Sequence, residues 1–423
     1  MVIYDFIHAY QPYDPKVLKP DWVYKNLSEI FIPTSNSLNE GYLKRAVNIK
    51  GWTLDNWHRD KDVSRLAIKV IGNINRGRSK KHLEVGFSSY SHAILPLLSE
   101  NILEAQIKLD YKTVSRYLGE PMWFWPPEGA VDKKTLEVIY KFYPGVIVVI
   151  PDLALDKINF SGIGRIRHGN GFQKVIIMNS LLKDVFMNAH VYKPIPPHIT
   201  RHSDYIRVND ISKIAENPAI LESLLREINP SLNVLMRDWE NAGSLIGLRK
   251  VDSTSKIGEL HLEHEALLNL KGEFKLPSST DFDDSVIYDI TEIVEASWEL
   301  IGGTSNPYIY WNPQKDKEYF HSLTEVQQLA ANEWYSLIKK LDEDLNIWIE
   351  RYGGVDNILR NKKLEQRLKD ILPAFMSCIP WHFLANKVFG PDIEFTLAAK
   401  EKIMMPRIHK LSRYLLQESL ANK

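Results

Sequence analysis

Two short stretches of the sequence place an acidic side chain beside tryptophan at the end of an apolar run. Residues 122–131 read MWFWPPEGAV and contain Glu128, and residues 234–242 read VLMRDWENA and contain Asp238. Cleavage of a glycosidic bond with retained configuration needs two carboxyl groups, one as nucleophile and one as acid and then base. Flat aromatic rings beside them suit the faces of sugars. The two stretches therefore predict a glycosidase whose fold brings Glu128 and Asp238 together.

Composition predicts an ordinary globular protein. The chain has 423 residues, of which 44% are hydrophobic and 25% are charged, enough for one large domain with an appendage or for two to three domains. Lys plus Arg and Asp plus Glu both total 53, so the formal net charge is zero. This balance gives no reason to expect a nucleic acid or an anionic membrane as partner.

The sequence also indicates a compartment. Its first residues, MVIYDFIH, lack the basic region and apolar core of a signal peptide, and no run of 18 apolar residues predicts a spanning helix. Cys378 is the single cysteine, which excludes an intrachain disulfide and a zinc site built from cysteines. We therefore expect a cytoplasmic protein without a membrane partner, and the Lys-, Glu- and Ile-rich composition favours a thermophilic source.

Strand and helix patterns alternate through the first two thirds of the chain, which predicts right-handed crossovers and a parallel sheet or barrel. Seven apolar runs predict strands: Val2–His8, Glu29–Ile32, His82–Gly86, Met122–Trp125, Gly145–Ile150, Lys174–Met178 and Asn233–Arg237. Helical patterns between them are Ser91–Glu104, Leu109–Leu118, Lys133–Phe142 and Ala219–Ile228. Chemistry in such a barrel lies where strands end, and His8, Glu128 and Asp238 all occupy predicted strand ends.

A second pattern begins between residues 260 and 290. Long amphipathic helices are predicted at Ser322–Leu345, Lys362–Ile371 and Phe395–Leu416. We expect a catalytic barrel over residues 1–275 and a helical domain over residues 276–423 that contributes to the active-site cleft.

Five motifs, in order along the chain, resemble those of glycoside hydrolase family 57, a group of α-glucan-active enzymes. They are His8-Ala-Tyr-Gln11-Pro12, the stretch from Glu84 through His92 to Pro96, Trp125-Pro-Pro-Glu128-Gly-Ala, Asp238-Trp-Glu240-Asn241-Ala, and Ser297-Trp298 followed by Trp311. Each motif alone is weak, whereas five in the right order are specific.

The resemblance implies an α/β fold, a distorted (β/α)7 TIM-like barrel with a C-terminal helical domain, and a retaining mechanism with no cofactor and no metal. It implies Glu128 as nucleophile and Asp238 as acid/base, with their carboxyl groups roughly 5–5.5 Å apart. Oligo- or polysaccharide α-glucan is the expected substrate, and the activity expected is α-amylase-like. The expected substrate-binding residues are His8, Gln11, His92, Trp125, Trp239, Glu240, Trp298, Trp311 and Trp381.

Each of these residues also has a purely structural interpretation. Glu128 could cap a helix that starts near Val131, and Asp238 could cap a strand end. His8 and His92 could be core histidines with satisfied hydrogen bonds. Each of the tryptophans could belong to the core.

Other functions remain open at this point. A 4-α-glucanotransferase or a branching-type transglycosylase would share the first half-reaction. Tyr10 stands where the family commonly has a second histidine, and Cys378 replaces an acid in a Ser-Asp-x-x-Trp string, which leaves a non-catalytic glycan-binding relative as an alternative. The spacing of His198 and His202 would suit a metal-dependent polysaccharide deacetylase, although the Asp283-Asp284 pair lies downstream of the histidines, in the wrong order. The oligomeric state is equally open, a homo-oligomer included.

Overall fold

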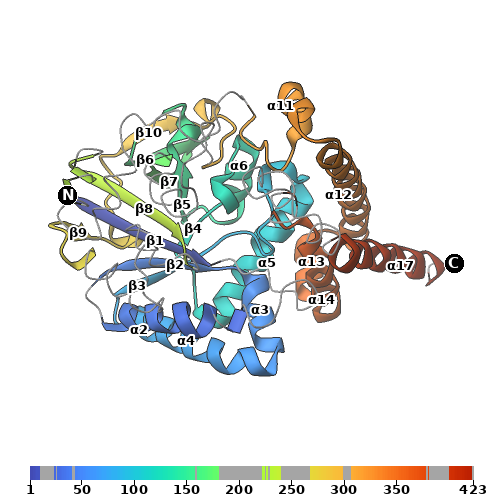
Figure 1. Ribbon diagram of the computed structural model, residues 1–423, viewed down its shortest axis with the longest axis horizontal. Helices are drawn as coiled ribbons and strands as arrows, with labels where there is room; N and C mark the ends of the chain where they lie inside the picture. The colour runs from blue at the N-terminus through green and yellow to red at the C-terminus, as the bar shows by residue number, and fades with distance from the viewer. Residues whose placement is uncertain are drawn as a thin grey trace.

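A curled, mostly parallel sheet forms the centre of the molecule in the computed structural model (Figure 1). The structure describes residues 1–9, 23–24, 26–40, 43–157, 160–180, 222–223, 225–226, 229–239, 267–298, 306–377, 380 and 400–421. Seven strands follow one another in the order β8-β1-β2-β3-β4-β5-β7, and every neighbouring pair is parallel. Their bounds are β1 Val2–Ala9, β2 Arg45–Ile49, β3 Leu83–Phe87, β4 Trp123–Phe124, β5 Ile147–Pro151, β7 Gly171–Met178 and β8 Leu232–Asp238.

The sheet is a distorted barrel of the (β/α)7 kind. Strand β8 lies against β7, which brings the two ends of the parallel series together. Strand β6 (Gly162–His168) pairs antiparallel with β7, and β10 (Val286–Asp289) continues the edge beside β6. The short strand β9 (Glu273–Phe274) pairs with the start of β1. Strand β10 thus belongs to the sheet, although its residues lie in the range 276–423 that sequence patterns assign to the helical domain.

Alternation along each strand separates the barrel interior from the outer layer. Tyr4 and Phe6 belong to a cluster inside the barrel with Trp123, whereas Ile7 belongs to the cluster between sheet and helices. Because neighbouring side chains on a strand point to opposite faces, His8 shares the interior face with Phe6. His8 is two residues nearer than Phe6 to the carboxyl end of the strand, which is the end where barrel enzymes have their catalytic residues.

Helices cover the sheet. The covering set is α2 Ile32–Glu40, α3 Gly51–Arg59, α4 Lys61–Ser79, α5 Glu100–Leu118 and α6 Lys133–Phe142. Local signals explain their ends: the Asp132 carboxylate accepts from the backbone N–H of Thr135 and so caps α6.

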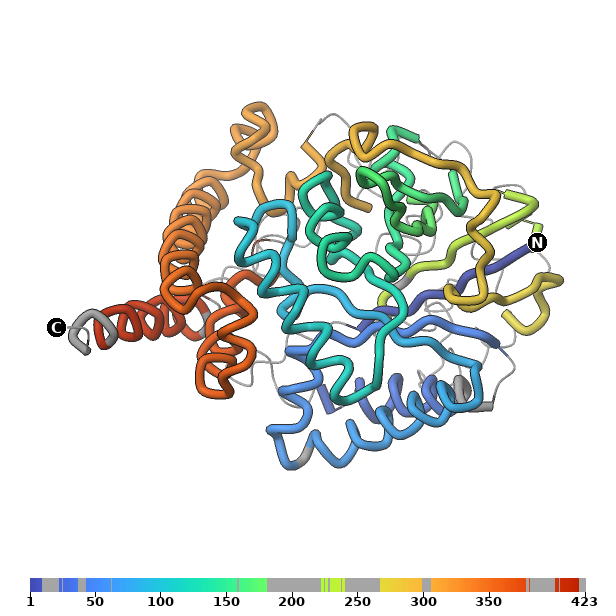
Figure 2. The backbone as a smooth tube through the Cα atoms, turned by 180° about the vertical axis from the view of Figure 1, so that it is seen from behind, coloured from blue at the N-terminus to red at the C-terminus, as the bar shows by residue number. Residues whose placement is uncertain are grey.

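A group of C-terminal helices lies beyond the carboxyl ends of the strands, beside α5, in both views (Figures 1 and 2). They are α11 Lys317–Ser322, α12 Glu325–Arg351, α13 Val355–Arg360, α14 Lys362–Ile371 and α17 Met405–Ala421. A capping box between Thr324 and Gln327 starts α12. The prediction of long C-terminal helices is confirmed.

Ion pairs with at least one buried partner attach these helices to the barrel layer. Lys369 of α14 lies 2.9 Å from Asp55 of α3, and both side chains are buried. Glu365, one turn earlier, accepts from Lys112 of α5 at 2.6 Å. Removing one partner of such a pair leaves an uncompensated buried charge, so these contacts hold α14 in one place on the barrel.

The structure corrects the predicted second strand. Glu29–Ile32 is helical, part of a π-helical turn Leu27–Phe31 that runs into α2, because Leu27, Ile30 and Phe31 repeat with helical spacing and are buried. The strand at this place in the order is instead β2. Its run, RAVNI, has two polar residues that hide the strand pattern, and the Arg45 guanidinium is buried against Asp5 at 2.6 Å.

The predicted helix Ser91–Glu104 is wrong over residues 91–99 and correct from Glu100 onward. Residues 91–99 precede α5 as an irregular loop with one 3-10 turn, Leu95–Leu97, since Pro96 lacks the backbone N–H that a continuous helix needs. The run Gly162-Ile-Gly164 forms the start of strand β6. A Cβ atom at Gly164 would lie 2.7 Å from the Tyr288 ring, so the close packing of this ring on β6 requires glycine.

Candidate active site

His8 and Asp238 meet at the carboxyl ends of two neighbouring strands. They are register partners on β1 and β8, and His8 Nε2 lies 3.5 Å from Asp238 Oδ1. The histidine side chain is 2% exposed, whereas the carboxylate is 23% exposed. Strand pairing alone therefore places the predicted acid/base at the mouth of the barrel, above a buried imidazole.

Glu128 stands in a tight turn after β4 with a left-handed backbone. Its φ is +56°, and the next residue, Gly129, has a φ of +59°. A non-glycine residue in this region is strained, and such strain persists where surrounding structure imposes it, often at functional sites. Here the Trp298 backbone N–H donates to the Glu128 carbonyl at 2.9 Å, and a β-bridge joins Val131 to Ala296.

Trp298 also binds the Glu128 side chain. Its indole Nε1–H donates to Glu128 Oε2 at 3.0 Å, so one residue of the later segment holds both the backbone and the carboxylate of the predicted nucleophile. The Glu128 side chain remains 21% exposed. A donated hydrogen bond stabilises the negative charge of a carboxylate and keeps one of its oxygens in a defined direction.

His92 links the two carboxylates. Its ring stacks on His8 with 5.1 Å between ring centroids and an interplanar angle of 7°. Its Nδ1 lies 3.6 Å from Glu128 Oε1 and 2.8 Å from Ser377 Oγ. Like Glu128, it has a left-handed backbone, with a φ of +60°. A continuous run of contacts thus leads from Asp238 through two stacked imidazoles to Glu128.

Burial favours the neutral form of both imidazoles at neutral pH. Burial lowers the pKa of His8 and of His92 well below the usual value, and the positive charge of Lys50 lowers both further. The contacts at 3.5 and 3.6 Å therefore join neutral rings to carboxylates and are not ion pairs between full charges.

Lys50 and Asn48 are site residues that sequence patterns missed, because the strand that carries them was missed. Asn48 is the register partner of His8 on β2, and its side-chain amide donates to the carbonyl of Gly86 on β3 at 2.9 Å. Lys50 directly follows β2 and is completely buried. The burial of Lys50 is visible only in the structure, so the sequence offered no signal for this residue.

Asp110 of α5 binds the segments that directly follow β2 and β3, next to the candidate site. Its carboxylate accepts from the backbone N–H groups of Gly51 at 2.5 Å and Ser88 at 2.6 Å. Burial raises the pKa of Asp110 to about 6, against the opposing effects of Lys50 and of these two hydrogen bonds. The carboxylate thereby ties the ends of β2 and β3 to the helix behind them.

The described tryptophans of the prediction are buried. Trp125 and Trp298 face each other inside the barrel with 5.2 Å between ring centroids. Trp311 packs in a small cluster with Ala130, next to the Glu128 turn. Trp239 is completely buried and packs on Phe31 at 4.9 Å, so the structure places it in the core, in keeping with its structural interpretation. Several residues of the predictions lie outside the described residues: Tyr10, Gln11, His198, His202, Glu240, Cys378 and Trp381.

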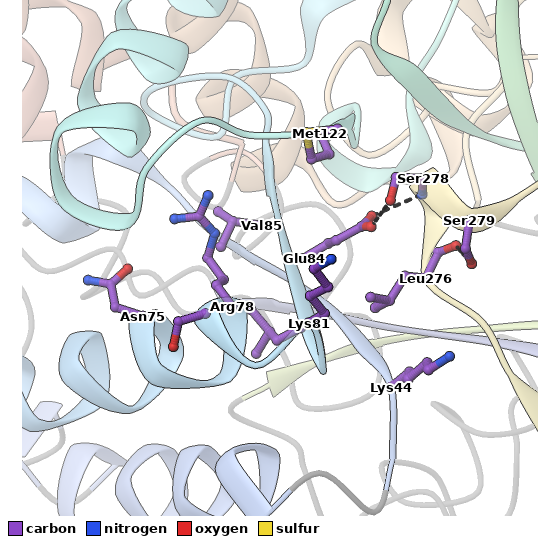
Figure 3. A pocket seen from close by; sticks show the side chains of 12 residues that line it. Lys44, Asn75, Arg78, Lys81, Glu84, Val85, Met122, Leu276, Ser278 and Ser279 are labelled. Carbon is purple, nitrogen blue, oxygen red and sulfur yellow. Dashed lines mark hydrogen bonds between the residues drawn. The ribbon is translucent and has the colours of Figure 1, made fainter.

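A hollow of about 770 Å³ lies at the opposite, amino-terminal end of the strands (Figure 3). Glu84 enters it and accepts from the Ser278 backbone N–H at 3.0 Å and from the Ser278 hydroxyl. Arg78 at its edge donates to the Leu118 and Glu120 carbonyls at and just after the end of α5. These polar groups have structural partners, as expected for the stabilising face of a barrel, so the hollow is separate from the candidate site.

Two features are absent from the part of the chain that the structure describes. None of its helices combines the length and apolar character needed to cross a membrane. The same residues contain no group of three or more His, Cys, Asp or Glu side chains placed to hold a metal ion.

A parallel barrel with two carboxylates at its mouth, each beside a neutral histidine, defines the class of glycosidase-type barrel proteins. Residues 9–211 match the family model described as Glycosyl hydrolase family 57. The matched stretch is just under half of the chain, and this stretch is similar to that family.

Solved structures share the fold. The 4-alpha-glucanotransferase from Thermococcus litoralis has a TM-score of 0.59 at 15% identity, with 98% of this chain and 60% of that chain covered. The alpha-amylase AmyC from Thermotoga maritima has a TM-score of 0.57 at 14% identity, covering 97% and 95%. The GH57-type branching enzyme from Pyrococcus horikoshii has a TM-score of 0.50 at 14% identity, covering 98% and 96%. At these identities the likeness concerns the fold alone.

A curated protein of another kind also matches. The ATP-dependent protease ATPase subunit HslU of Campylobacter jejuni is 27% identical over 186 residues, which are 40% of this chain and 42% of that protein. The chain thus spans about two fifths of the length of this curated relative. A phosphate-binding loop of the ATPase type needs the pair Gly-Lys, and no Gly-Lys pair occurs in the sequence. The match therefore supports no nucleotide site here.

Proposed function

We propose that the chain is a retaining glycoside hydrolase that acts on α-glucans through Glu128 as nucleophile and Asp238 as acid/base. The observation that carries the proposal is the run of contacts from Asp238 through His8 and His92 to Glu128 at the barrel mouth. The match of residues 9–211 to the model of glycoside hydrolase family 57 supports glycosidic chemistry. The names of the fold relatives, an alpha-amylase, a 4-alpha-glucanotransferase and a branching enzyme, support an α-glucan as substrate.

The reaction proceeds in two displacements. In the first, an oxygen of Glu128 attacks the anomeric carbon while Asp238 donates its proton to the glycosidic oxygen, so the bond to the leaving sugar breaks and a glycosyl ester forms. In the second, Asp238 takes a proton from water as the water oxygen attacks the same carbon. The ester bond then breaks, and Glu128 leaves as a carboxylate.

The neutral histidines suit both steps. Because burial keeps the pKa of His8 well below its usual value, the ring does not take the proton that Asp238 has to deliver. A neutral imidazole keeps one ring N–H, which is able to donate to a carboxylate or a sugar hydroxyl. His92 lies beside Glu128, and burial lowers the pKa of its ring in the same way.

Variants of the two carboxylates test the proposal. We expect Glu128→Gln and Asp238→Asn each to lower kcat/KM on maltooligosaccharides by several orders of magnitude with an unchanged circular dichroism spectrum. Glu84→Gln is the matched control, since it changes a buried barrel carboxyl at the other end of the strands and is expected to retain activity. Parental rates in either site variant would exclude the assignment.

Azide rescue separates the two roles. With Glu128→Ala, azide replaces the nucleophile in a single inversion, and we expect a β-glycosyl azide from an α-glucan. With Asp238→Ala, azide attacks the glycosyl ester after the first inversion, and we expect the α-azide. Swapped configurations would reverse the two assignments.

Product analysis distinguishes hydrolysis from transfer. Hydrolysis of maltoheptaose produces only shorter sugars, whereas a 4-α-glucanotransferase also produces longer ones and a branching enzyme introduces α-1,6 bonds. We expect chain shortening, read as a ladder by anion-exchange chromatography.

A further inference from the structure

A short segment after α14 joins the C-terminal helices to the candidate site. The 3-10 turn Leu372–Phe375 follows α14, and Met376 just after it forms an antiparallel β-bridge with Ala93. The Ser377 backbone N–H donates to the His92 carbonyl at 3.1 Å. Further back, the Ser91 hydroxyl donates to the Leu372 carbonyl at 2.9 Å. These bonds fasten the loop that carries His92 to a segment almost 300 residues later in the chain.

The Ser377 side chain reaches the His92 ring itself. Its Oγ lies 2.8 Å from Nδ1, and both residues are buried. The same Nδ1 lies 3.6 Å from Glu128 Oε1. The ring nitrogen therefore stands between a hydroxyl from the helical region and the carboxylate of the proposed nucleophile.

This geometry selects one form of the imidazole. A neutral ring carries its single proton on Nδ1 or on Nε2, and the hydrogen bonds of the nitrogens decide which. A carboxylate oxygen near Nδ1 favours the form with the proton on Nδ1, because a bare lone pair there would face negative charge. In this form Nδ1–H donates to Ser377 Oγ, and the ring cannot turn over without losing that bond.

We propose that Ser377 is a positioning residue that holds the His92 ring in the orientation and tautomer presented to Glu128, so that the helical region completes the active site of the barrel. The inference rests on the proposed function for Glu128 as nucleophile. Ser377 touches no substrate in this scheme and acts through His92.

Kinetics provide the first test. Ser377→Ala is expected to lower kcat by about 10- to 100-fold, the cost of a small misplacement at a reacting centre. KM is expected to stay within about twofold, since no contact with substrate is lost. Ser377→Thr keeps the hydroxyl and is expected to restore most of kcat. Ser91→Ala is the matched control, because it removes a buried serine hydrogen bond between the same two segments without touching the ring.

Nuclear magnetic resonance tests the ring directly, without activity. In protein labelled with 15N-histidine, His92→Gln identifies the His92 signals among the 13 histidines. We expect the parent to show a single tautomer with the proton on Nδ1, and Ser377→Ala to shift both nitrogens toward averaged values. Should the alanine variant not fold, Ser377→Cys takes its place, since its S–H is a weak partner in a side chain of similar size.

The outcomes separate the two proposals. An unchanged tautomer and unchanged kcat in Ser377→Ala would overturn the role of Ser377, even with Glu128→Gln inactive. An equal loss of kcat in Ser91→Ala would also overturn the role of Ser377. The loss would then come from weaker packing between the His92 loop and the segment after α14, and not from the contact of Ser377 with the ring. Activity that survives in Glu128→Gln would instead remove the proposed function, and the 15N signals would still decide whether Ser377 sets the ring.

Discussion

Replacement of Trp298 by phenylalanine tests the mechanism most directly. The change removes the Nε1–H donor that lies 3.0 Å from Glu128 Oε2 and retains an aromatic ring against Trp125. A hydrogen bond to a charged group contributes about 1.5–3 kcal/mol. Each 1.36 kcal/mol of barrier is about a factor of ten in rate, so the expected loss is on the order of 10- to 100-fold.

The loss is expected in the second displacement. In the first, Glu128 gives up its charge to the new bond, so a donor aimed at it has less effect in the transition state. In the second, the carboxylate regains its charge as it leaves, and a fixed donor lowers that barrier. Trp298→Phe should therefore accumulate the glycosyl ester, seen as a burst of aglycone from an aryl maltooligoside and as a mass increase on the protein.

Trp125→Phe is the matched control. It makes the same substitution in the facing ring, whose Nε1 has no hydrogen-bond partner among the described residues. We expect it to lower stability without a burst. Equal kcat in the two variants, with no covalent adduct in either, would refute the reasoning.

Two other predictions concern stability. His8 and His92 have lowered pKa values in the folded chain, so below about pH 6.5 the unfolded chain binds more protons and each histidine costs about 1.4 kcal/mol per pH unit. Urea unfolding should show stability falling from pH 7 to pH 5.5, less steeply in His8→Gln; an unchanged slope would contradict this. Gly129→Ala should lower the melting temperature and kcat, because a Cβ at φ +59° would meet Trp298 Cβ at 3.0 Å. Gly145→Ala, with nothing within 4 Å, should be silent in both measurements, and an equal effect of the two would be the contrary result.

Most of the barrel could be predicted from local pattern. Apolar runs marked six of the seven parallel strands, because a strand buried on both faces has few polar residues. The missed strand, β2, has Arg45 and Asn48 inside it, and these are tolerated because Asp5 and the Gly86 carbonyl satisfy them. The hydrogen-bond or ion-pair partner of a polar residue on another strand cannot be read from the residues of one strand. Because β2 was not predicted, Lys50 at its end was not predicted as a site residue either.

The sequence by itself determined which reactive groups are available: two carboxylates and two histidines next to apolar runs. Chain order and strand ends were enough to place His8, Glu128 and Asp238 at one edge of a sheet. Only the tertiary structure decided how they are held. The left-handed turn at Glu128 depends on hydrogen bonds from Trp298, and the ring of His92 depends on Ser377. These contacts cross 170 and 285 positions of the chain, and no local preference encodes them, because they form only when the later segments pack against the barrel mouth.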